Sequence, residues 1–328
     1  MIRRTIGNSR PLNAIGLGCM GMAAFYGQPM EEGDAVKLLH SAVDLGVDHF
    51  DTAELYGFGA NEELLGAAFH DRRDKAFIAT KFGPVGDLAT RTVRGVDGSE
   101  ANMRRAIEQS LRMLKTDHID LYYLHRKDPA LPIEETVGAM AKLVAEGKIG
   151  AIGLSEVNAE TLRRAQAVAP IAAVQWEYSI FTRDIEREVL PHCWETGVSV
   201  VAYSPLGRGM LTGAFSREVR PEGQDYRAVV SPRFQGDAYG ANIALVDEIE
   251  RLAKARGATP SQIALAWVLA TKPNVVTIPG TTRLANLESN LKAAEIVLTE
   301  QETASLDGLA DKVQGTRYDE RGMTLVDA

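Results

Sequence analysis

The chain has little of what marks disulfide-rich, membrane-spanning or nucleic-acid-binding proteins. Its 328 residues include two cysteines, Cys19 and Cys193, which are too few for a disulfide scaffold. No segment approaches the roughly 18 uninterrupted apolar residues that a membrane helix needs, and no apolar stretch follows the basic N-terminus as in a signal peptide. Acidic residues outnumber basic ones by 44 to 36, which argues against a nucleic-acid footprint. We therefore expect a cytoplasmic protein with neither a nucleic-acid nor a membrane partner.

What the sequence does contain is an alternation of short apolar runs with longer segments of helical period. Most of the runs are nearly continuous in apolar character, as is typical of parallel strands covered on both faces. We expect eight strands, at 14–20, 49–54, 76–81, 119–125, 149–155, 171–178, 198–205 and 275–280. Several helical segments stop at a glycine suited to a left-handed cap, such as Gly46, Gly147 and Gly197. No linker divides the chain, so we expect a single domain that spans residues 1–328. The pattern favours a closed (β/α)₈ TIM barrel rather than two doubly wound sheets.

Three segments fall outside the strand–helix repeat. Residues 3–15 indicate a β-hairpin that turns at "GNSR" and covers the bottom of the barrel. The connections at 82–99 and at about 206–241 are too long to be simple loops. Both follow strands, so they should rise from the C-terminal face of the barrel, where active sites lie.

Polar residues stand where the predicted strands end. They are Asp51, Lys81, His125, Ser155, Gln175 and Tyr203, with Tyr56 just past the second strand. A single lysine after a strand is most often a solvated surface residue. The occurrence of such residues at consecutive strand ends instead indicates a common site at the barrel mouth.

Four of these residues together can supply a proton to a carbonyl oxygen. A phenol with a pKa of about 10 is a poor donor at neutral pH, but a lysine cation about 4 Å away favours the phenolate by about 4 kcal/mol. Asp51 would keep the buried Lys81 charged, and His125 would add a second donor to the same oxygen. We therefore expect Lys81 and Asp51 to lower the pKa of Tyr56, the proton donor.

The sequence offers no reducing group, so a bound cofactor would have to supply a hydride. It shows neither the paired strand-end carboxylates of a glycosidase, nor a second histidine for a metal triad, nor a G-x-S-x-G elbow. We expect no metal site. The last strand runs into "IPGTTRLANLESN", which opens a helix with Arg283 in its first turn. A helix start after the eighth barrel strand is typical of a phosphate site.

The motifs "GLGCMGM", "HFDTAELYG", "IATKFG", "IDLYYLH", "VQWEYS", "AYSPLGRGMLTG" and "IPGTTR" occur in this order. With them the chain, over about residues 10 to 295, resembles the aldo-keto reductase family, nearest to its branch related to potassium channel β subunits. The resemblance implies reduction of an aldehyde or ketone by NADPH on a TIM barrel. It also implies a catalytic tetrad of Asp51, Tyr56, Lys81 and His125.

The resemblance further implies which residues hold NADPH. Ser155, Glu156 and Gln175 match positions at the nicotinamide carboxamide, and Tyr203 matches the ring that stacks on the nicotinamide. Contacts with the cofactor are also implied for Gly18, Cys19, Met20 and Asp51. Further contacts are implied for Ser204, Pro205, Leu206, Gly207 and Arg208 at the pyrophosphate, and for Gly280, Thr282, Arg283, Ser289 and Asn290 at the adenosine end.

The chain departs from the family pattern at three of these positions. Glu156 stands where many members have asparagine, and Ser289 where glutamate or glutamine is usual. Gly280 replaces a lysine that some members use on the 2′-phosphate. Arg283 would then carry the preference for NADP.

Two other functions remain open at this point. Lys81 could form a Schiff base in a class I aldolase or lyase, or the chain could bind NADPH as a regulatory protein with little turnover. The physiological carbonyl substrate and the oligomeric state are open as well. The aromatics Phe25, Tyr26, Phe82, Trp176, Tyr178 and Phe181 either line an apolar substrate pocket or pack in the core.

Overall fold

The eight predicted strands form one parallel sheet that closes into a barrel. The computed structural model describes residues 1–24, 28–87, 92–223 and 225–327. The sheet has the order β12-β11-β10-β9-β8-β5-β4-β3. The strands are β3 (Leu17–Gly18), β4 (His49–Asp51), β5 (Phe77–Phe82), β8 (Leu121–Leu124), β9 (Ile152–Ser155), β10 (Ile171–Glu177), β11 (Ser199–Tyr203) and β12 (Val275–Thr277). Parallel bridges from Ile15 to Thr277 and from Gly18 to Gly280 join the two edges. The predicted (β/α)₈ fold is confirmed.

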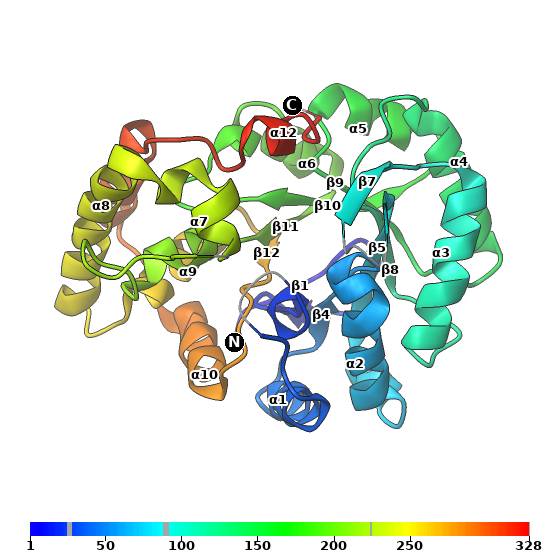
Figure 1. The fold of residues 1–328 in the computed structure, drawn as a ribbon, viewed down its shortest axis with the longest axis horizontal. Coiled ribbons are helices and arrows are strands. Elements are labelled where there is room, and N and C mark those ends of the chain that lie inside the picture. The colour runs from blue at the N-terminus through cyan, green and yellow to red at the C-terminus, as the bar shows by residue number, and fades with distance from the viewer. Residues whose placement is uncertain (25–27, 88–91, 224, 328) are drawn as a thin grey trace.

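Helices follow the strands in sequence and lie outside them (Figure 1). They are α1 (Glu32–Asp44), α2 (Ala60–Phe69), α3 (Glu100–Met113), α4 (Ile133–Ala145), α5 (Ala159–Gln166), α6 (Val189–Thr196), α9 (Pro260–Thr271) and α10 (Leu284–Leu291). Thr259 and Gln262 form a capping box that starts α9, with Pro260 in its first turn. Gly46, Gly147 and Gly197 have the positive φ predicted for helix ends. Within the described ranges, none of the helices is long and apolar enough to cross a membrane.

Side chains alternate between two apolar layers along each strand. On β8, Leu121 and Tyr123 belong to a cluster inside the barrel, whereas Tyr122 and Leu124 belong to the larger cluster between strands and helices. On β5, Phe77 and Ala79 point inward. Because every second side chain of β5 points inward, Lys81 is the next inward residue after Ala79. It lies near the carboxyl end of the strand.

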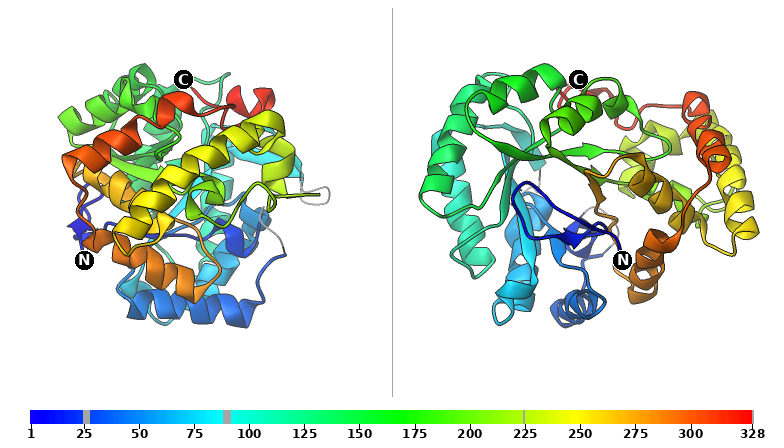
Figure 2. Two further views of the ribbon diagram at one scale, coloured as in Figure 1. Left: turned by 90° about the vertical axis from the view of Figure 1, so that its left-hand side faces the viewer. Right: turned by 180° about the vertical axis from the view of Figure 1, so that it is seen from behind.

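The N-terminal hairpin closes the bottom of the barrel, as predicted. Its strands β1 (Arg3–Arg4) and β2 (Leu12–Asn13) are antiparallel, and Ile6 and Leu12 join the interior cluster. The hairpin lies in front of the strands in the right panel of Figure 2, and the C-terminal end of the chain lies behind them. Gly7 has φ +53°, and a Cβ there would come within 2.6 Å of the Cβ of Ala172. Only glycine therefore fits this turn without a shift of the backbone.

The long connections carry elements of their own. Residues 82–99 include the antiparallel pair β6 (Pro84–Asp87) and β7 (Thr92–Val96). The connection that begins at 206 includes α7 (Tyr226–Val230) and ends earlier than predicted, because residues 236–241 belong to α8 (Gly236–Ala255). Beyond α10 the chain forms α11 (Glu300–Asp307) and α12 (Glu320–Met323). This C-terminal segment runs along the upper edge of the molecule in Figure 1.

Candidate active site

Lys81 brings the predicted catalytic residues together at the barrel mouth. Its Nζ atom donates hydrogen bonds to Asp51 Oδ1 at 2.5 Å and to the Thr52 carbonyl at 2.8 Å, and it lies 3.4 Å from the Tyr56 hydroxyl oxygen. The side chains of Lys81 and Asp51 are 0% and 3% exposed. Neighbouring strands β4 and β5 hold the pair, with Asp51 in register with Ala79. The cation is therefore fixed between a carboxylate and a phenol.

Lys81 keeps its proton although it is buried. Burial alone would lower its pKa, but the charge of Asp51 and the contacts with Tyr56 outweigh burial and raise the pKa above its usual value. A protonated amine is not a nucleophile. The aldolase alternative needs a neutral Lys81 and gains no support from this environment.

The pKa of Tyr56 shifts opposite to the sequence-based expectation. Burial raises it, and this effect exceeds the lowering by the cation of Lys81. The prediction of a lowered Tyr56 pKa was therefore wrong for the free protein, because the sequence did not reveal how fully the phenol is enclosed. Tyr56 is thus protonated at neutral pH, and Lys81 stands where it would stabilise the phenolate left by proton transfer.

His125 completes the predicted tetrad from the end of β8. Its backbone N–H bonds to the Phe82 carbonyl at 2.8 Å, and its ring meets the Tyr56 ring edge to face with centroids 5.9 Å apart. Burial and the cations of Arg126 and Lys81 hold the pKa of His125 well below its usual value. The imidazole is therefore neutral, with one N–H to donate. Its Nδ1 has no hydrogen-bond partner in the described part of the chain.

Gln175, predicted to bind a carboxamide, also touches the tetrad. Its Nε2 donates to Asp51 Oδ2 at 2.7 Å, so both oxygens of Asp51 accept a hydrogen bond. The predicted neighbour Ser155 is 1% exposed at the end of β9. Its hydroxyl oxygen accepts from Arg126 Nη1 at 3.3 Å.

The carboxylate of Glu156 is engaged by the C-terminal segment. Arg317 Nη1 donates to Glu156 Oε1 at 2.8 Å, and Arg317 Nη2 lies 2.7 Å from Glu156 Oε2. Both side chains are at most 3% exposed. The backbone of Glu156 has φ +55°, a left-handed conformation that is uncommon for a side-chain-bearing residue. The Glu156 carboxylate is therefore already paired with Arg317, and a contact of this carboxylate with a cofactor would compete with that ion pair.

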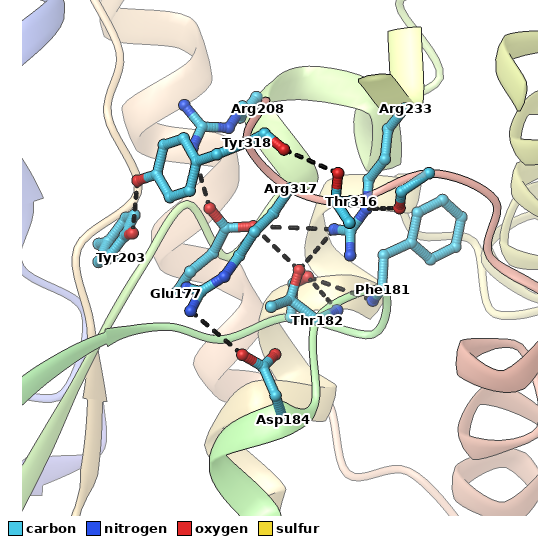
Figure 3. A network of polar contacts seen from close by, with 12 residues as sticks. Glu177, Phe181, Thr182, Asp184, Tyr203, Arg208, Arg233, Thr316, Arg317 and Tyr318 are labelled. Carbon is cyan, nitrogen blue, oxygen red and sulfur yellow. Dashed lines mark hydrogen bonds and ion pairs between the residues drawn. The ribbon is translucent and has the colours of Figure 1, made fainter. Parts of the chain in front are cut away.

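A second buried carboxylate, Glu177, lies beside Arg317 (Figure 3). Arg208 Nη2 donates to Glu177 Oε2 at 3.0 Å, and Thr182 donates to Oε1 at 2.9 Å. Burial alone would raise the pKa of Glu177, but Arg208, Arg317 and Arg233 together lower it. Arg208, predicted at the pyrophosphate, is thus oriented by a carboxylate at the end of β10.

Tyr203 ends β11 with its ring partly exposed. Its hydroxyl is 2.7 Å from the hydroxyl of Tyr318. The Arg208 guanidinium lies over the Tyr318 ring, 4.7 Å from its centroid. Figure 3 shows Tyr318 between Tyr203 and Arg208. The C-terminal segment thereby reaches the residue predicted to stack on a nicotinamide.

The chain past Tyr203 makes a tight turn. Ser204, Gly207 and Arg208 all have positive φ, and the Gly207 N–H bonds to the Ser204 carbonyl. Pro205 is buried, whereas Leu206 is partly exposed. The turn therefore presents backbone close to the barrel mouth, as a phosphate-binding loop requires.

The residues predicted for the adenosine end lie around α10. Arg283 caps the helix with an exposed side chain, and Thr282 and Gly280 are exposed beside it. Ser289 accepts from Gln262 Nε2 through its hydroxyl oxygen at 3.1 Å. Asn290 is 4% exposed. An exposed guanidinium at a helix N-terminus fits a phosphate.

At the end of β3 the three predicted contact residues differ in exposure. Gly18 and Met20 are partly exposed, whereas the thiol of Cys19 is buried. Burial, followed by the charge of Asp51, raises the pKa of Cys19 far above its usual value. The thiol is therefore not a reactive group, and a contact of Cys19 with a ligand would run through its backbone.

Four of the six aromatics considered for a substrate pocket pack in the core. Phe82, Trp176, Tyr178 and Phe181 belong to the cluster between strands and helices and are at most 3% exposed. Phe25 and Tyr26 lie outside the described residues. The pocket interpretation therefore does not hold for the four, because their side chains are buried in this apolar cluster.

Sequence reasoning missed four residues that shape the mouth, namely Arg126, Glu177, Arg317 and Tyr318. Arg126 directly follows His125 and could have been found as a strand-end cation. Glu177 ends an apolar strand in the same way. Arg317 and Tyr318 come from the C-terminal segment, and nothing near them in the sequence signals a return to the barrel.

The family comparison agrees with this geometry. A model of the Aldo/keto reductase family matches residues 14–311. The chain is 45% identical over 294 residues to "Probable aldo-keto reductase 1" of Glycine max, covering 89% of this chain and 83% of that protein. It is 43% identical over 323 residues to "Aldo-keto reductase yakc [NADP(+)]" of Schizosaccharomyces pombe, covering 96% and 94%.

Solved structures are similar over nearly the whole chain. The glycerol dehydrogenase AKR11B4 from Gluconobacter oxydans matches with a TM-score of 0.87 and 32% identity, covering 97% of this chain and 98% of that one. An aldo/keto reductase from Klebsiella pneumoniae in complex with NADP and acetate matches with a TM-score of 0.75 and 31% identity, covering 97% and 98%.

Proposed function

The chain belongs to the Aldo/keto reductase family, and from this premise we propose that it reduces aldehydes or ketones to alcohols, reversibly, with NADPH. The single observation that carries the proposal is the buried contact of Lys81 with both Asp51 and Tyr56. This contact supplies a protonated phenol and a fixed cation beside it.

The chain's own residues account for the proton and the orientation of the substrate. Tyr56 holds a proton at neutral pH and would give it to the carbonyl oxygen. Lys81 stabilises the resulting phenolate, and Asp51 keeps Lys81 charged. Neutral His125 would donate its N–H to the same oxygen and so fix the carbonyl in place.

The residues at the mouth fit NADPH, which supplies the hydride when bound. The partly exposed ring of Tyr203 would support the nicotinamide, and Ser155 and Gln175 would bind its carboxamide. Arg208 would meet the pyrophosphate, and the exposed Arg283 at the start of α10 would meet the 2′-phosphate. The relative from Schizosaccharomyces pombe carries NADP(+) in its name, which supports NADP as the cofactor here.

A panel of aldehydes, ketones and quinones, followed by NADPH absorbance, tests this function. Tyr56→Phe is the diagnostic variant, because it keeps the ring but removes the transferable proton. We expect reduction of a good substrate to fall by about 10²–10⁴, with NADPH affinity nearly unchanged. Folding is checked by thermal melting. Absence of turnover across the panel, despite NADPH binding, would favour the regulatory alternative, and a Tyr56→Phe variant with near wild-type rate would contradict the role of Tyr56.

A further inference from the structure

Arg126 places a second cation at the mouth, directly after His125. Its Nη1 donates to the His125 carbonyl at 2.7 Å and to the Ser155 hydroxyl at 3.3 Å, and its Nη2 donates to the Tyr318 hydroxyl at 3.4 Å. The side chain is partly exposed. All three acceptors are neutral, so none of them balances the charge of the guanidinium.

Among the described residues, the lack of a contacting carboxylate distinguishes Arg126 from Arg208 and Arg317. In the described part of the chain, no carboxylate oxygen lies within 4.0 Å of its guanidinium, whereas Arg208 and Arg317 each contact a buried glutamate. Arginine stays charged under all ordinary conditions. With only neutral groups in direct contact, the guanidinium can still pair with a ligand that carries the opposite charge.

Arg126 also has donors to spare. A guanidinium has five N–H groups, and its three hydrogen bonds to the described residues leave Nε–H and one N–H of Nη2. Two free donors suit the two oxygens of a carboxylate. Phosphate sites usually gather more donors than this, often with backbone N–H groups.

The position of Arg126 places such an anion next to the reacting carbonyl. His125, its neighbour in the chain, packs against the ring of Tyr56. Ser155 and Tyr318, its other contacts, lie at the end of β9 and against Tyr203. The guanidinium therefore stands between the tetrad and the C-terminal segment.

We propose that Arg126 is a subsite for a carboxylate on the substrate, so that the enzyme favours aldehyde or keto acids over neutral carbonyl compounds. The inference rests on the proposed carbonyl reduction. Tyr318 acts as a positioning residue, because its hydroxyl orients the guanidinium. The buried ion pair of Arg317 with Glu156 fixes the adjoining backbone.

Matched acid and ester substrates test the subsite. The pairs are succinic semialdehyde with its methyl ester, and 4-carboxybenzaldehyde with its methyl ester, each measured as kcat/KM from NADPH absorbance. We expect the wild type to prefer the acid of at least one pair. In Arg126→Gln the acid-to-ester ratio of that pair should fall about ten- to hundredfold, the usual worth of hydrogen bonds to a charged group. Arg126→Lys should retain part of the preference.

Lys127→Gln is the matched control, since it removes the same charge one residue away. Lys127 faces Asp327, with Nζ 3.8 Å from its carboxylate, so this variant should keep the acid-to-ester ratio. A ratio near one for both pairs in the wild type would overturn the inference, as would a ratio unchanged in Arg126→Gln. In either case carbonyl reduction itself would stand.

Binding separates failure of the subsite from failure of the proposed function. Each acid and ester is titrated calorimetrically into wild type and Arg126→Gln with NADP⁺, which cannot reduce an aldehyde. Tighter binding of an acid that is lost in Arg126→Gln supports the subsite even where no carbonyl is turned over. Equal binding of acids and esters to the wild type overturns it, and this comparison needs no variant to fold.

Discussion

The Nζ atom of Lys81 lies 3.4 Å from the hydroxyl oxygen of Tyr56, in a part of the barrel where Lys81 is not exposed to solvent. At such a distance, a cation in partly screened surroundings favours a phenolate by about 4 kcal/mol. Burial works against this effect and keeps Tyr56 protonated before the reaction. Tyr56 therefore holds its proton before the reaction, and Lys81 stabilises the phenolate that remains after the proton is transferred.

Replacement of Lys81 by methionine should remove most turnover. The phenolate of Tyr56 would lose its cation, and Asp51 would be left buried without its ion pair. We expect kcat for a good aldehyde to fall by about 10²-fold or more, with NADPH affinity changed little. Lys75→Met, at an exposed lysine, is the matched control. Near wild-type kcat in folded Lys81→Met would contradict this role.

The strand ends were predictable because burial on both faces leaves a continuous apolar run. Where such a run stops at Asp51 or Lys81, a polar residue marks the mouth of the barrel. The same logic applied to His125, and the structure brings all three near Tyr56.

The remaining parts of the site depend on contacts between distant segments. Glu156 and Arg317 are separated by 161 positions in sequence, and no local period links them. The pKa of Tyr56 was predicted in the wrong direction for a related reason, because enclosure of a phenol depends on the packing of the whole mouth. The family resemblance implied that Arg208 meets the pyrophosphate, but not that it would pair with Glu177.

Arg283 should determine the preference for NADPH over NADH. Its exposed guanidinium at the start of α10 can bind the 2′-phosphate, which NADH lacks. In Arg283→Ala we expect NADPH affinity to fall about ten- to hundredfold and NADH affinity to stay nearly constant, as read by fluorescence titration. Lys292→Ala, an exposed cation just past the same helix, controls for general charge. If the ratio of the NADPH and NADH affinities were unchanged in Arg283→Ala, another residue would have to recognise the 2′-phosphate.

NADPH should protect the connection between β11 and α8 from proteolysis. Arg208 on this connection is predicted to meet the pyrophosphate, and Gly207, Gly209 and Gly213 have the positive φ that lets the backbone bend there. Trypsin should cut after the exposed Arg217, at least about tenfold more slowly with NADPH at 100 times its Kd. Cleavage after exposed Lys75, followed by mass spectrometry in the same sample, serves as the reference. Equal rates after Arg217 with and without NADPH would show that this connection does not close over the cofactor.

Glu62 should make the protein less stable as the pH rises from acid to neutral. This residue of α2 is fully buried and accepts a hydrogen bond from Thr80 at 2.6 Å. Burial raises its pKa from 4.5 to about 7, although the hydrogen bond from Thr80 opposes the shift. Between these pH values the unfolded chain releases a proton that the folded protein retains, so the free energy of unfolding decreases with pH. The stabilisation is complete below pH 4.5 and is lost as the pH reaches about 7, a change of about 3 kcal/mol.

Glu62→Gln has no proton to release between these pH values, so its free energy of unfolding, measured with urea, should lack this part of the decline. Glu63→Gln, at an exposed neighbour, should follow the wild type. Parallel pH profiles for wild type and Glu62→Gln would show that folding does not raise the pKa of Glu62.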